Sequence, residues 1–454
     1  MSDIIEQPRF SCALAAQQTV LAIPRGIPIV HAGPGCVGKT FAFTSYGAGY
    51  QGEGYAGGGN ISCTNATEQE VVFGGEKKLQ DLVEGTFQVI KGDLFVILAG
   101  CTAGIIGDDV EKVARSFSAK GAPVVGVETS GFKGNNYYGH ELVVREIINQ
   151  FVGDVTPRVR EKVVNVFSVV PYQDAFWRAD LEEIKRLLEA IGLEVHILFG
   201  HGSGGASEWK DIPNAAFNLV LSPWVGLQTA QLLQKKYGTP YLHYPILPVG
   251  AKATRKFLRT VGAYAGLPRG QVEAVIQREE KRFYDYFVVL GDFIVDMSNN
   301  IPFELYTVAD SAYALGTTDY LVNEMGLLPK GIYLMDEPVS SFVPEIRGAL
   351  KHICGISPEL LEIEPDGGVI QEHIRRKIGK SRKAVILGST WEANLAKENN
   401  NLLVRLSLPI NDDVIVNRSF VGYNGGLRLT EELYSGIFRK GNITQNTQLQ
   451  EDAV

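Results

Sequence analysis

Short apolar strands alternate with helical stretches along nearly the whole chain, and this alternation limits the possible folds most strongly. In the first region the sequence predicts helices over 77–90 and 109–120, between strands at 27–30, 94–98 and 122–127. Strands joined by helices favour a parallel sheet that is covered on both faces. The 454 residues are too many for one domain of about 100–200 residues, so several such sheets are expected.

The same alternation continues beyond residue 160. The sequence predicts further strands at 163–170, 193–199, 215–221, 240–244, 304–308, 330–335, 384–387 and 402–406. Helices are predicted from an Asp180 N-cap and over 227–237, 309–325 and 427–439, and a charged helical stretch over 251–298 should bridge domains. We therefore predict an α/β fold of three Rossmann-like domains with parallel sheets flanked by helices. The expected divisions are 1–160, 161–285 with the bridging helices, 286–440, and a disordered polar tail over 441–454.

A glycine-rich segment over 47–59 interrupts the pattern. It contains seven glycines, with Tyr50 and Tyr55 between them. Glycine in a helix interior costs about 1 kcal/mol relative to alanine, so this segment is predicted to be a loop.

Charge and hydropathy exclude several classes of protein. The 43 basic and 51 acidic residues give a net charge of −8, which argues against a nucleic-acid partner because phosphates attract basic surfaces. The N-terminus lacks the basic-then-apolar layout of a signal peptide. The apolar-rich run over 94–107 is shorter than the roughly 20 residues that a membrane helix needs. We expect a soluble, cytoplasmic protein with no membrane partner.

One motif matches a phosphate-binding loop. Gly33-Pro-Gly-Cys-Val-Gly38-Lys39-Thr40 follows an apolar strand, and Lys39 and Thr40 would then hold phosphate and Mg²⁺. The glycine-rich segment would cut the following helix within two turns, and the neighbouring strand ends in Cys101 instead of an acidic residue. Nucleotide binding therefore remains only the less favoured interpretation.

The cysteines favour metal chemistry. Four of the five lie in the first 101 residues, and an odd number argues against a disulfide framework. Cys36 and Cys101 each follow an apolar strand and a glycine, at strand ends where α/β domains place ligands, and Cys12 lies in the first apolar stretch. Thiolates select iron–sulfur clusters, although buried cysteines that act as small apolar side chains remain the alternative.

Longer motifs resemble the nitrogenase component 1 superfamily, in particular its β-type subunit. The motifs near the cysteines are His31-Ala-Gly-Pro-Gly-Cys36, Val72-Phe-Gly-Gly75 and Cys101-Thr-Ala-Gly-Ile-Ile-Gly107-Asp108-Asp109. Later ones are Tyr237-Gly-Thr-Pro-Tyr241, Leu247-Pro-Val-Gly250, Ala253-Thr-Arg-Lys-Phe257 and Val421-Gly-Tyr-Asn-Gly-Gly426. The resemblance covers nearly the whole chain.

The resemblance implies an α₂β₂ heterotetramer with an iron–sulfur P-cluster of the 8Fe-7S type, shared between α-type and β-type subunits. By motif, its ligands from this chain would be Cys12, Cys36 and Cys101. A transient ATP-dependent reductase homodimer would supply electrons. The active-site iron–sulfur cofactor would lie in the α-type partner, because the 200–300 stretch has no matching cysteine and Asn218-Leu-Val-Leu-Ser222 stands there instead.

The chain also departs from nitrogenase proper. Where that family often has a serine in a Thr-Pro-Ser-Phe stretch, this chain has Thr129-Ser130-Gly131-Phe132, so Ser130 is a displaced candidate ligand. The glycine-rich segment and the sequence around Cys36 resemble the nitrogenase-like reductases more closely. Among these is methylthio-alkane reductase, an oxidoreductase of sulfur metabolism. Alternatives are a nitrogenase β subunit, a cofactor-assembly scaffold of the same superfamily, and a nucleotide-binding protein.

A few further residues carry weaker expectations. Cys63 is expected not to bind the cluster, and Cys354 is expected to pack in a core. His31 could hydrogen-bond near the cluster or be structural. Asp108 and Asp109 are both expected to cap the helix that begins at Val110, because acidic residues favour a helix N-terminus.

Overall fold

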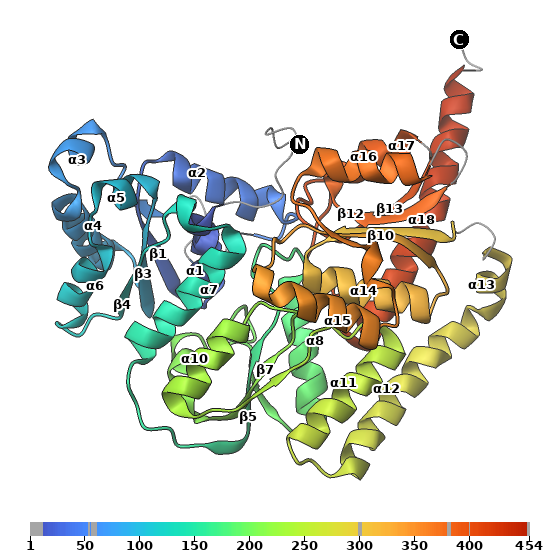
Figure 1. Cartoon of the computed structure of the whole chain (residues 1–454), viewed down its shortest axis with the longest axis horizontal. Coiled ribbons are helices and arrows are strands. Elements are labelled where there is room, and N and C mark those ends of the chain that lie inside the picture. The colour runs from blue at the N-terminus through green and yellow to red at the C-terminus, as the bar shows by residue number, and fades with distance from the viewer. Residues whose placement is uncertain are drawn as a thin grey trace. The chain divides into compact units, whose positions relative to one another are not determined.

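The computed structural model describes residues 12–52, 55, 61–297, 302–378, 383–398 and 400–451 (Figure 1). These residues form three parallel sheets flanked by helices, as the sequence predicts. Two compact units result. One comprises Phe10–Tyr244 with Ile410–Asn417 and holds the first two sheets; the other includes Pro245–Pro409 and Arg418–Val454 and holds the third.

The first sheet has the strand order β2-β1-β3-β4, and all its pairs are parallel. Its strands are β1 (Gly26–His31), β2 (Ser62–Cys63), β3 (Leu94–Ala99) and β4 (Val124–Val127). Its helices are α1 (Gln17–Leu21), α2 (Gly35–Ala42), α3 (Glu68–Phe73), α4 (Glu76–Val89), α5 (Cys101–Ile106), α6 (Val110–Ser118) and α7 (Asn136–Glu146), with a 3₁₀ turn η1 (Ala13–Ala16). Apolar side chains of α4 and α6 pack on β1 and β3 to form one core, as the helical periodicity predicts.

The second sheet has the order β6-β5-β7-β8 and is also parallel. Its elements are β5 (Arg160–Phe167), α8 (Trp177–Ala190), β6 (Glu194–His196), α9 (Ala206–Asp211), β7 (Ala215–Val220), α10 (Leu227–Tyr237) and β8 (Tyr241–His243). The predicted Asp180 cap is wrong. The helix starts at Trp177, whose ring is buried, and Asp180 lies buried in the first turn, so packing decides the start.

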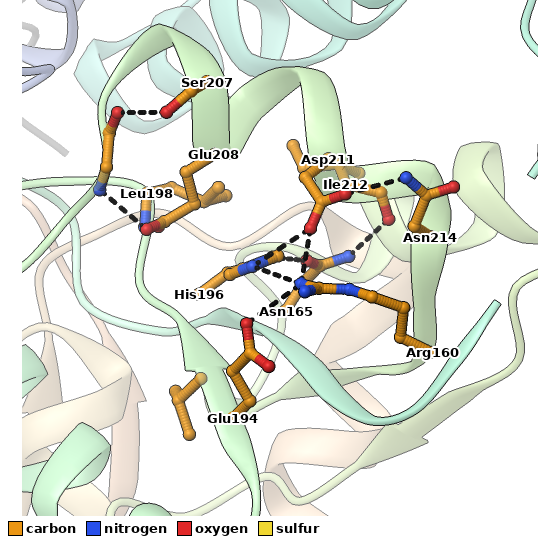
Figure 2. Close-up of polar contacts among 12 residues, drawn as sticks. Arg160, Asn165, Glu194, His196, Leu198, Ser207, Glu208, Asp211, Ile212 and Asn214 are labelled. Atoms are coloured by element: carbon orange, nitrogen blue, oxygen red, sulfur yellow. Dashed lines mark hydrogen bonds and ion pairs between the residues drawn. The ribbon is translucent and has the colours of Figure 1, made fainter. Parts of the chain in front are cut away.

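A polar network joins the second sheet to Asp211 at the end of α9 (Figure 2). His196 Nδ1 lies 2.9 Å from Asn165 Oδ1, and Arg160 donates to Glu194 at 3.0 Å and Asp211 at 2.6 Å. Burial lowers the pKa of His196, which favours its neutral form. The network holds α9 against β5 and β6, so these charged groups have a structural role.

The third sheet has the order β11-β10-β9-β12-β13. Its strands are β9 (Glu304–Ala309), β10 (Leu328–Leu334), β11 (Leu361–Ile363), β12 (Ala384–Gly388) and β13 (Leu402–Arg405). The helices are α14 (Ser311–Asn323), α15 (Val343–His352), α16 (Gly367–Ile378) and α17 (Ala393–Glu398). Sequence reasoning missed β11, because this three-residue strand carries a glutamate and is too short to show an alternating pattern.

The long helical stretch between the second and third sheets is three helices. These are α11 (Gly250–Tyr264), α12 (Arg269–Val289) and α13 (Gly291–Met297). Gly266 has a left-handed φ of +67° and Pro268 precedes α12, so this glycine and proline end one helix and start the next. The last helix, α18 (Gly422–Glu451), is longer than predicted and extends over most of the expected polar tail.

Gly47 ends a π-helical turn, η2 (Phe43–Gly47), and the glycine-rich segment then forms a loop over 48–52 and Tyr55, while 53–54 and 56–60 lie outside the described residues. Its backbone pairs with a returning segment, since Gly49 N donates to Ile410 O. Gly49 has a φ of +80°, and a Cβ there would lie 2.4 Å from Ile415 Cδ1. Glycine is therefore required for this close approach.

Among the described residues, we find no helix with the length and apolar content that crossing a bilayer requires.

Candidate metal centre

Two cysteines lie at the same edge of the first sheet. Cys36 is in the first turn of α2, directly after β1, and Cys101 is the first residue of α5, directly after β3. β1 and β3 are neighbours, with His31 opposite Ala99, so both cysteines follow the carboxyl ends of paired strands. This is the edge at which α/β sheets place ligands.

The third predicted cysteine reaches this edge from the start of the chain. Cys12 forms an antiparallel bridge with Asn135, and Ala13 N donates to Gly134 O at 3.0 Å. A Cβ on Gly131 would lie 3.3 Å from Cys12 Sγ and 3.0 Å from Cys101 Sγ. The thiols of Cys12 and Cys101 therefore meet at the backbone of Gly131.

Cys36 completes the group. Burial raises its pKa, and the charges of Cys12, Cys101 and Cys63 raise it further, while Lys39 lowers it. Cys12, Cys36 and Lys39 line one small hollow of about 130 Å³ together with Gln17. The three predicted residues thus lie in one neighbourhood, although they come from three separate elements: Cys12 shares the hollow with Cys36 and the Gly131 backbone with Cys101.

The residues present fit an iron–sulfur group. Two soft thiol donors, Cys12 and Cys36, line a hollow, and a third, Cys101, lies with Cys12 against Gly131, where a Cβ would crowd both sulfurs. Within the described ranges, no three His, Cys, Asp or Glu side chains are placed to bind a single ion. Cys12 and Cys36 are partly exposed at the hollow and Cys101 is exposed, so further ligands could approach from outside.

Cys63 lies near Cys36, and its sulfur contacts backbone groups. It ends β2, next to β1, and its Sγ donates to Ala32 O at 3.3 Å. Asn65 N donates to the same sulfur at 3.4 Å, and burial raises the pKa of the Cys63 thiol. These contacts suit a protonated, structural thiol. Cys354 is buried in the other compact unit, where burial also raises its pKa.

His31 belongs to a buried polar group beneath the cysteine edge. Its Nδ1 lies 3.0 Å from Thr64 Oγ1 and its Nε2 lies 2.9 Å from Asp108 Oδ2. Asp108 also accepts from Gly75 N at 3.0 Å. Both ring nitrogens are therefore used within the fold, which favours the structural interpretation of His31.

The expectation for Asp108 is corrected by these contacts. Asp109 alone caps α6, accepting from Lys112 N at 2.7 Å. Asp108 is buried and joins His31 to the start of α4 instead. Two adjacent acidic residues look alike in sequence, and only the burial of one separates their roles.

Ser130 does not point at the thiols. It is fully buried, and its hydroxyl donates to Gly100 O at 3.4 Å. A Cβ on Gly104 would lie 2.1 Å from Ser130 Oγ, so this side chain lies against α5. The residue that faces Cys12 and Cys101 is Gly131, which has no side-chain ligand.

The phosphate-loop interpretation does not fit the local structure. Only 32–34 connect β1 to α2, and Gly38, Lys39 and Thr40 lie inside the helix. Gly38 N donates to Pro34 O at 3.3 Å, and Thr40 Oγ1 donates to Cys36 O at 3.4 Å. A phosphate loop needs free backbone N–H groups before the helix, whereas here the helix already begins at Gly35 and Cys36 N donates to Gly33 O at 3.4 Å.

Sequence reasoning missed Gln17 and an exposed apolar surface. Gln17 is buried beside the hollow, with Nε2 3.5 Å from Cys36 O and an Oε1 that has no hydrogen-bond partner among the described residues. Val72, Phe73 and Ile105 of α3 and α5 are 70%, 82% and 76% exposed. Apolar residues on short helices carry no periodic signal that would have shown this exposure.

The chain thus has an α/β fold, with Cys36 and Cys101 at the carboxyl edge of its first sheet. Its sequence matches the family described as nitrogenase component 1 type oxidoreductase over residues 11–438. The chain therefore belongs to the nitrogenase component 1 family of oxidoreductases.

Individual relatives are distant and cover most of the chain. The B subunit of light-independent protochlorophyllide reductase from Angiopteris evecta is 23% identical over 392 residues, covering 80% of this chain and 71% of the relative. The nitrogenase molybdenum-iron protein α chain from Methanothermobacter thermautotrophicus is 26% identical over 458 residues, with coverages of 94% and 87%. The corresponding β chain from Rippkaea orientalis is 23% identical over 454 residues, with coverages of 94% and 83%.

Solved structures share the fold. The chain superposes on nitrogenase Cp1 at pH 6.5 with a TM-score of 0.78 and 22% identity, covering 97% of this chain and 94% of the other. For nitrogenase Cp1 at pH 5 the TM-score is 0.72 and the identity 19%, with coverages of 97% and 90%.

Proposed function

We propose that this chain is the β-type subunit of a nitrogenase-like reductase. It would hold a P-cluster with an α-type partner and relay electrons from an ATP-dependent iron–sulfur reductase to the partner's iron–sulfur cofactor. The convergence of Cys12, Cys36 and Cys101 at one sheet edge carries this proposal.

Each part of the site has a physical task. The three thiols would hold the P-cluster, and such a cluster stores and transfers electrons when bound. Lys39 lies near Cys36 and opposes the negative charge that several thiolates bring together. A cluster binds the thiolate, so the proton of the Cys36 thiol must be displaced. Because burial raises the pKa of this thiol, loading is favoured at higher pH.

The electron-relay role is supported by what replaces a cofactor ligand. By the resemblance, Asn218-Leu-Val-Leu-Ser222 stands in the stretch where the α-type subunit would offer a cysteine, and Asn218 is its first polar residue. Its side chain is fully buried in the second sheet, and its Oδ1 accepts from Asn165 Nδ2 at 2.9 Å. This is a packing position, so we assign the active-site cofactor to the partner.

Two apolar surfaces support the proposed partners. The first, formed by Val72, Phe73 and Ile105, is on the unit that contains the cysteine edge and would receive the reductase homodimer. Exposed Cys101 leaves the cluster open to ligands from the α-type subunit. Contiguous exposed apolar groups are uncommon on monomers and typical of interaction sites.

The second apolar surface lies on the other unit. A groove of about 480 Å³ is lined by aromatic and aliphatic residues of α12, α13 and α18, among them Tyr286, Phe293 and Leu427. Beside it Val288 and Val289 are 79% and 83% exposed. A heterotetramer needs a contact between its two halves in addition to the α–β contact, and we assign that contact to this surface.

For the substrate we propose a methylthio-alkane, by resemblance of the Cys36 segment to that group of reductases. Two electrons and two protons would cleave one C–S bond, giving methanethiol and the hydrocarbon. The pocket for this substrate would lie in the α-type subunit.

Iron analysis of the purified complex tests the proposal. Cys36→Ala and Cys101→Ala should each lose cluster iron and cluster absorbance, while Cys63→Ala should retain them. Unchanged iron in both variants would refute the cluster assignment.

Turnover assays then separate the remaining functions. With the reductase and ATP, release of methanethiol from a methylthio-alkane is expected. Reduction of dinitrogen or protochlorophyllide instead would identify a different substrate. An iron-loaded complex without turnover on any of them would indicate an assembly scaffold. Tight Mg²⁺-dependent ATP binding by this chain, lost in Lys39→Ala, would favour a nucleotide-binding protein.

A further inference from the structure

Three consecutive residues after β4 donate hydrogen bonds to three consecutive residues at the end of β3. Thr129 Oγ1 donates to Ala99 O at 3.0 Å, and Ser130 Oγ donates to Gly100 O at 3.4 Å. Gly131 N donates to Cys101 Sγ at 3.2 Å. Each donor lies 30 residues after its acceptor, so the three bonds form a regular ladder between neighbouring chain segments.

The ladder follows from the sheet. β3 and β4 are parallel neighbours with Leu98 opposite Val127, so the segments leaving them start side by side. Beyond the strands, side-chain hydroxyls replace the missing backbone partners. Thr129 and Ser130 are both fully buried, where a hydroxyl without a partner is costly, so these bonds are held firmly.

Close packing fixes the ladder from both sides. Gly104 leaves the space that Ser130 Oγ occupies, since a Cβ there would lie 2.1 Å away. Gly131 is pressed against the thiols, since its Cβ would lie 2.8 Å from Cys12 Cβ. Glycine at 104 and 131 is therefore required by the geometry of the ladder itself.

We propose that Thr129, Ser130 and Gly131 are positioning residues that fix the sulfur of Cys101 beside Cys12, and that the Gly131 N–H tunes the bound cluster. This inference rests on the proposed function for its redox part. Hydrogen bonds to cluster sulfurs favour the more reduced, more negative state and so raise the reduction potential. On this view Ser130 acts through the backbone of residue 100 and is not a cluster ligand.

A metal-free experiment tests the positioning. The parent is the full chain with Cys36→Ser and Cys63→Ser, which leaves Cys12, Cys101 and the buried Cys354. The probe is phenylarsine oxide, a trivalent arsenical that bridges two thiols lying close together. The parent should bind one equivalent through Cys12 and Cys101, and adding Ser130→Ala or Thr129→Val should weaken binding about tenfold, a loss of about 1.4 kcal/mol.

Ser118→Ala is the matched control. Its hydroxyl also donates to a backbone carbonyl, that of Arg115 at 3.2 Å, but on the exposed surface of α6. This variant should leave arsenical affinity unchanged. Failure of the parent to bind, or equal affinity in all variants, would overturn the positioning role.

The assembled complex tests the tuning. At unchanged iron content, Ser130→Ala should shift the cluster to a more negative midpoint potential than the wild type and Ser118→Ala. An unshifted potential with iron retained would overturn the tuning role. A wild-type complex without iron would instead overturn the proposed function, and the arsenical result would still decide whether the ladder positions Cys101.

Discussion

The first and third sheets have the same parallel build but different residues after their strands. In the third sheet, Asp310 follows β9 and caps α14 by accepting from Ala312 N and Tyr313 N, and Ser311 donates to Asp336 at 2.6 Å after β10. In the first sheet the segments after β1 and β3 instead carry Cys36 and Cys101, and a hollow lies beside Cys36. Both sheets thus present the carboxyl ends of parallel strands. The residue types at these ends decide whether the polar groups bond to each other, as in the third sheet, or can hold a bound group, as proposed for the first.

The largest expected difference between the two sheets concerns metal. Cys36→Ala or Cys101→Ala should remove most of the iron from the complex, because three widely separated ligands act together. Asp310→Ala should retain iron and lose only about 1 kcal/mol of stability with its helix cap. Metal analysis and urea unfolding of the three variants measure this contrast, and iron loss in Asp310→Ala would contradict it.

Substitution of Gly139, which packs against the turn after Cys12, should have a smaller effect on the first sheet. A Cβ on Gly139 in α7 would lie 2.0 Å from Ala13 O, so Gly139→Ala should displace the turn after Cys12. We expect a loss of about 1–3 kcal/mol in stability together with reduced iron. Gly38→Ala is the control, since a Cβ there meets nothing within 4 Å. Normal stability of Gly139→Ala would show that this backbone contact is not fixed.

The unit of the third sheet should respond to pH through Glu324. Burial raises the pKa of this carboxyl to about 6, although Ala251 N and Lys252 N donate to it. A raised carboxyl pKa stabilises the fold below the unfolded value of 4.5, and this contribution is lost as pH rises through about 6. The loss amounts to about 2 kcal/mol at most.

Glu324→Gln removes this titration and keeps the size of the side chain. The free energy of unfolding, measured by urea between pH 4 and 7, should fall less with rising pH in the variant than in the wild type. Parallel pH profiles would contradict the assignment.

The smallest expected effect separates two adjacent acidic residues. Asp109→Ala should cost about 1 kcal/mol through loss of the α6 cap. Asp108→Ala should cost more, because His31 and Gly75 lose a buried partner. Thermal unfolding of both variants gives the order, and a larger loss in Asp109→Ala would reverse it.

Much of the fold could be predicted from the sequence, because apolar strands and helical periodicity are local signals. Strands such as 94–98 and the helix over 227–237 lie where the pattern places them. The start of α8 could not be predicted, since burial of Trp177 outweighs a favourable cap at Asp180. Gly266 and Pro268 are sequence signals for the end of one helix and the start of the next. The charged helical pattern on both sides of them nevertheless favoured one continuous stretch over 251–298.

The site was partly predictable for a similar reason. A cysteine shortly after an apolar strand is expected at the carboxyl edge of a sheet. This pattern predicted the positions of Cys36 and Cys101. Thr129 and Gly131 gave no such signal, because their partners depend on the register of β4 beside β3. The pairing of His31 with Asp108 likewise joins residues far apart in the chain.

Anomalous scattering at the iron edge, recorded from crystals of the purified complex of this chain with its partner subunit, is the most direct test. The proposed function predicts a compact group of iron atoms bounded by the sulfurs of Cys12, Cys36 and Cys101. Iron density elsewhere, with these three sulfurs unbound, would contradict it.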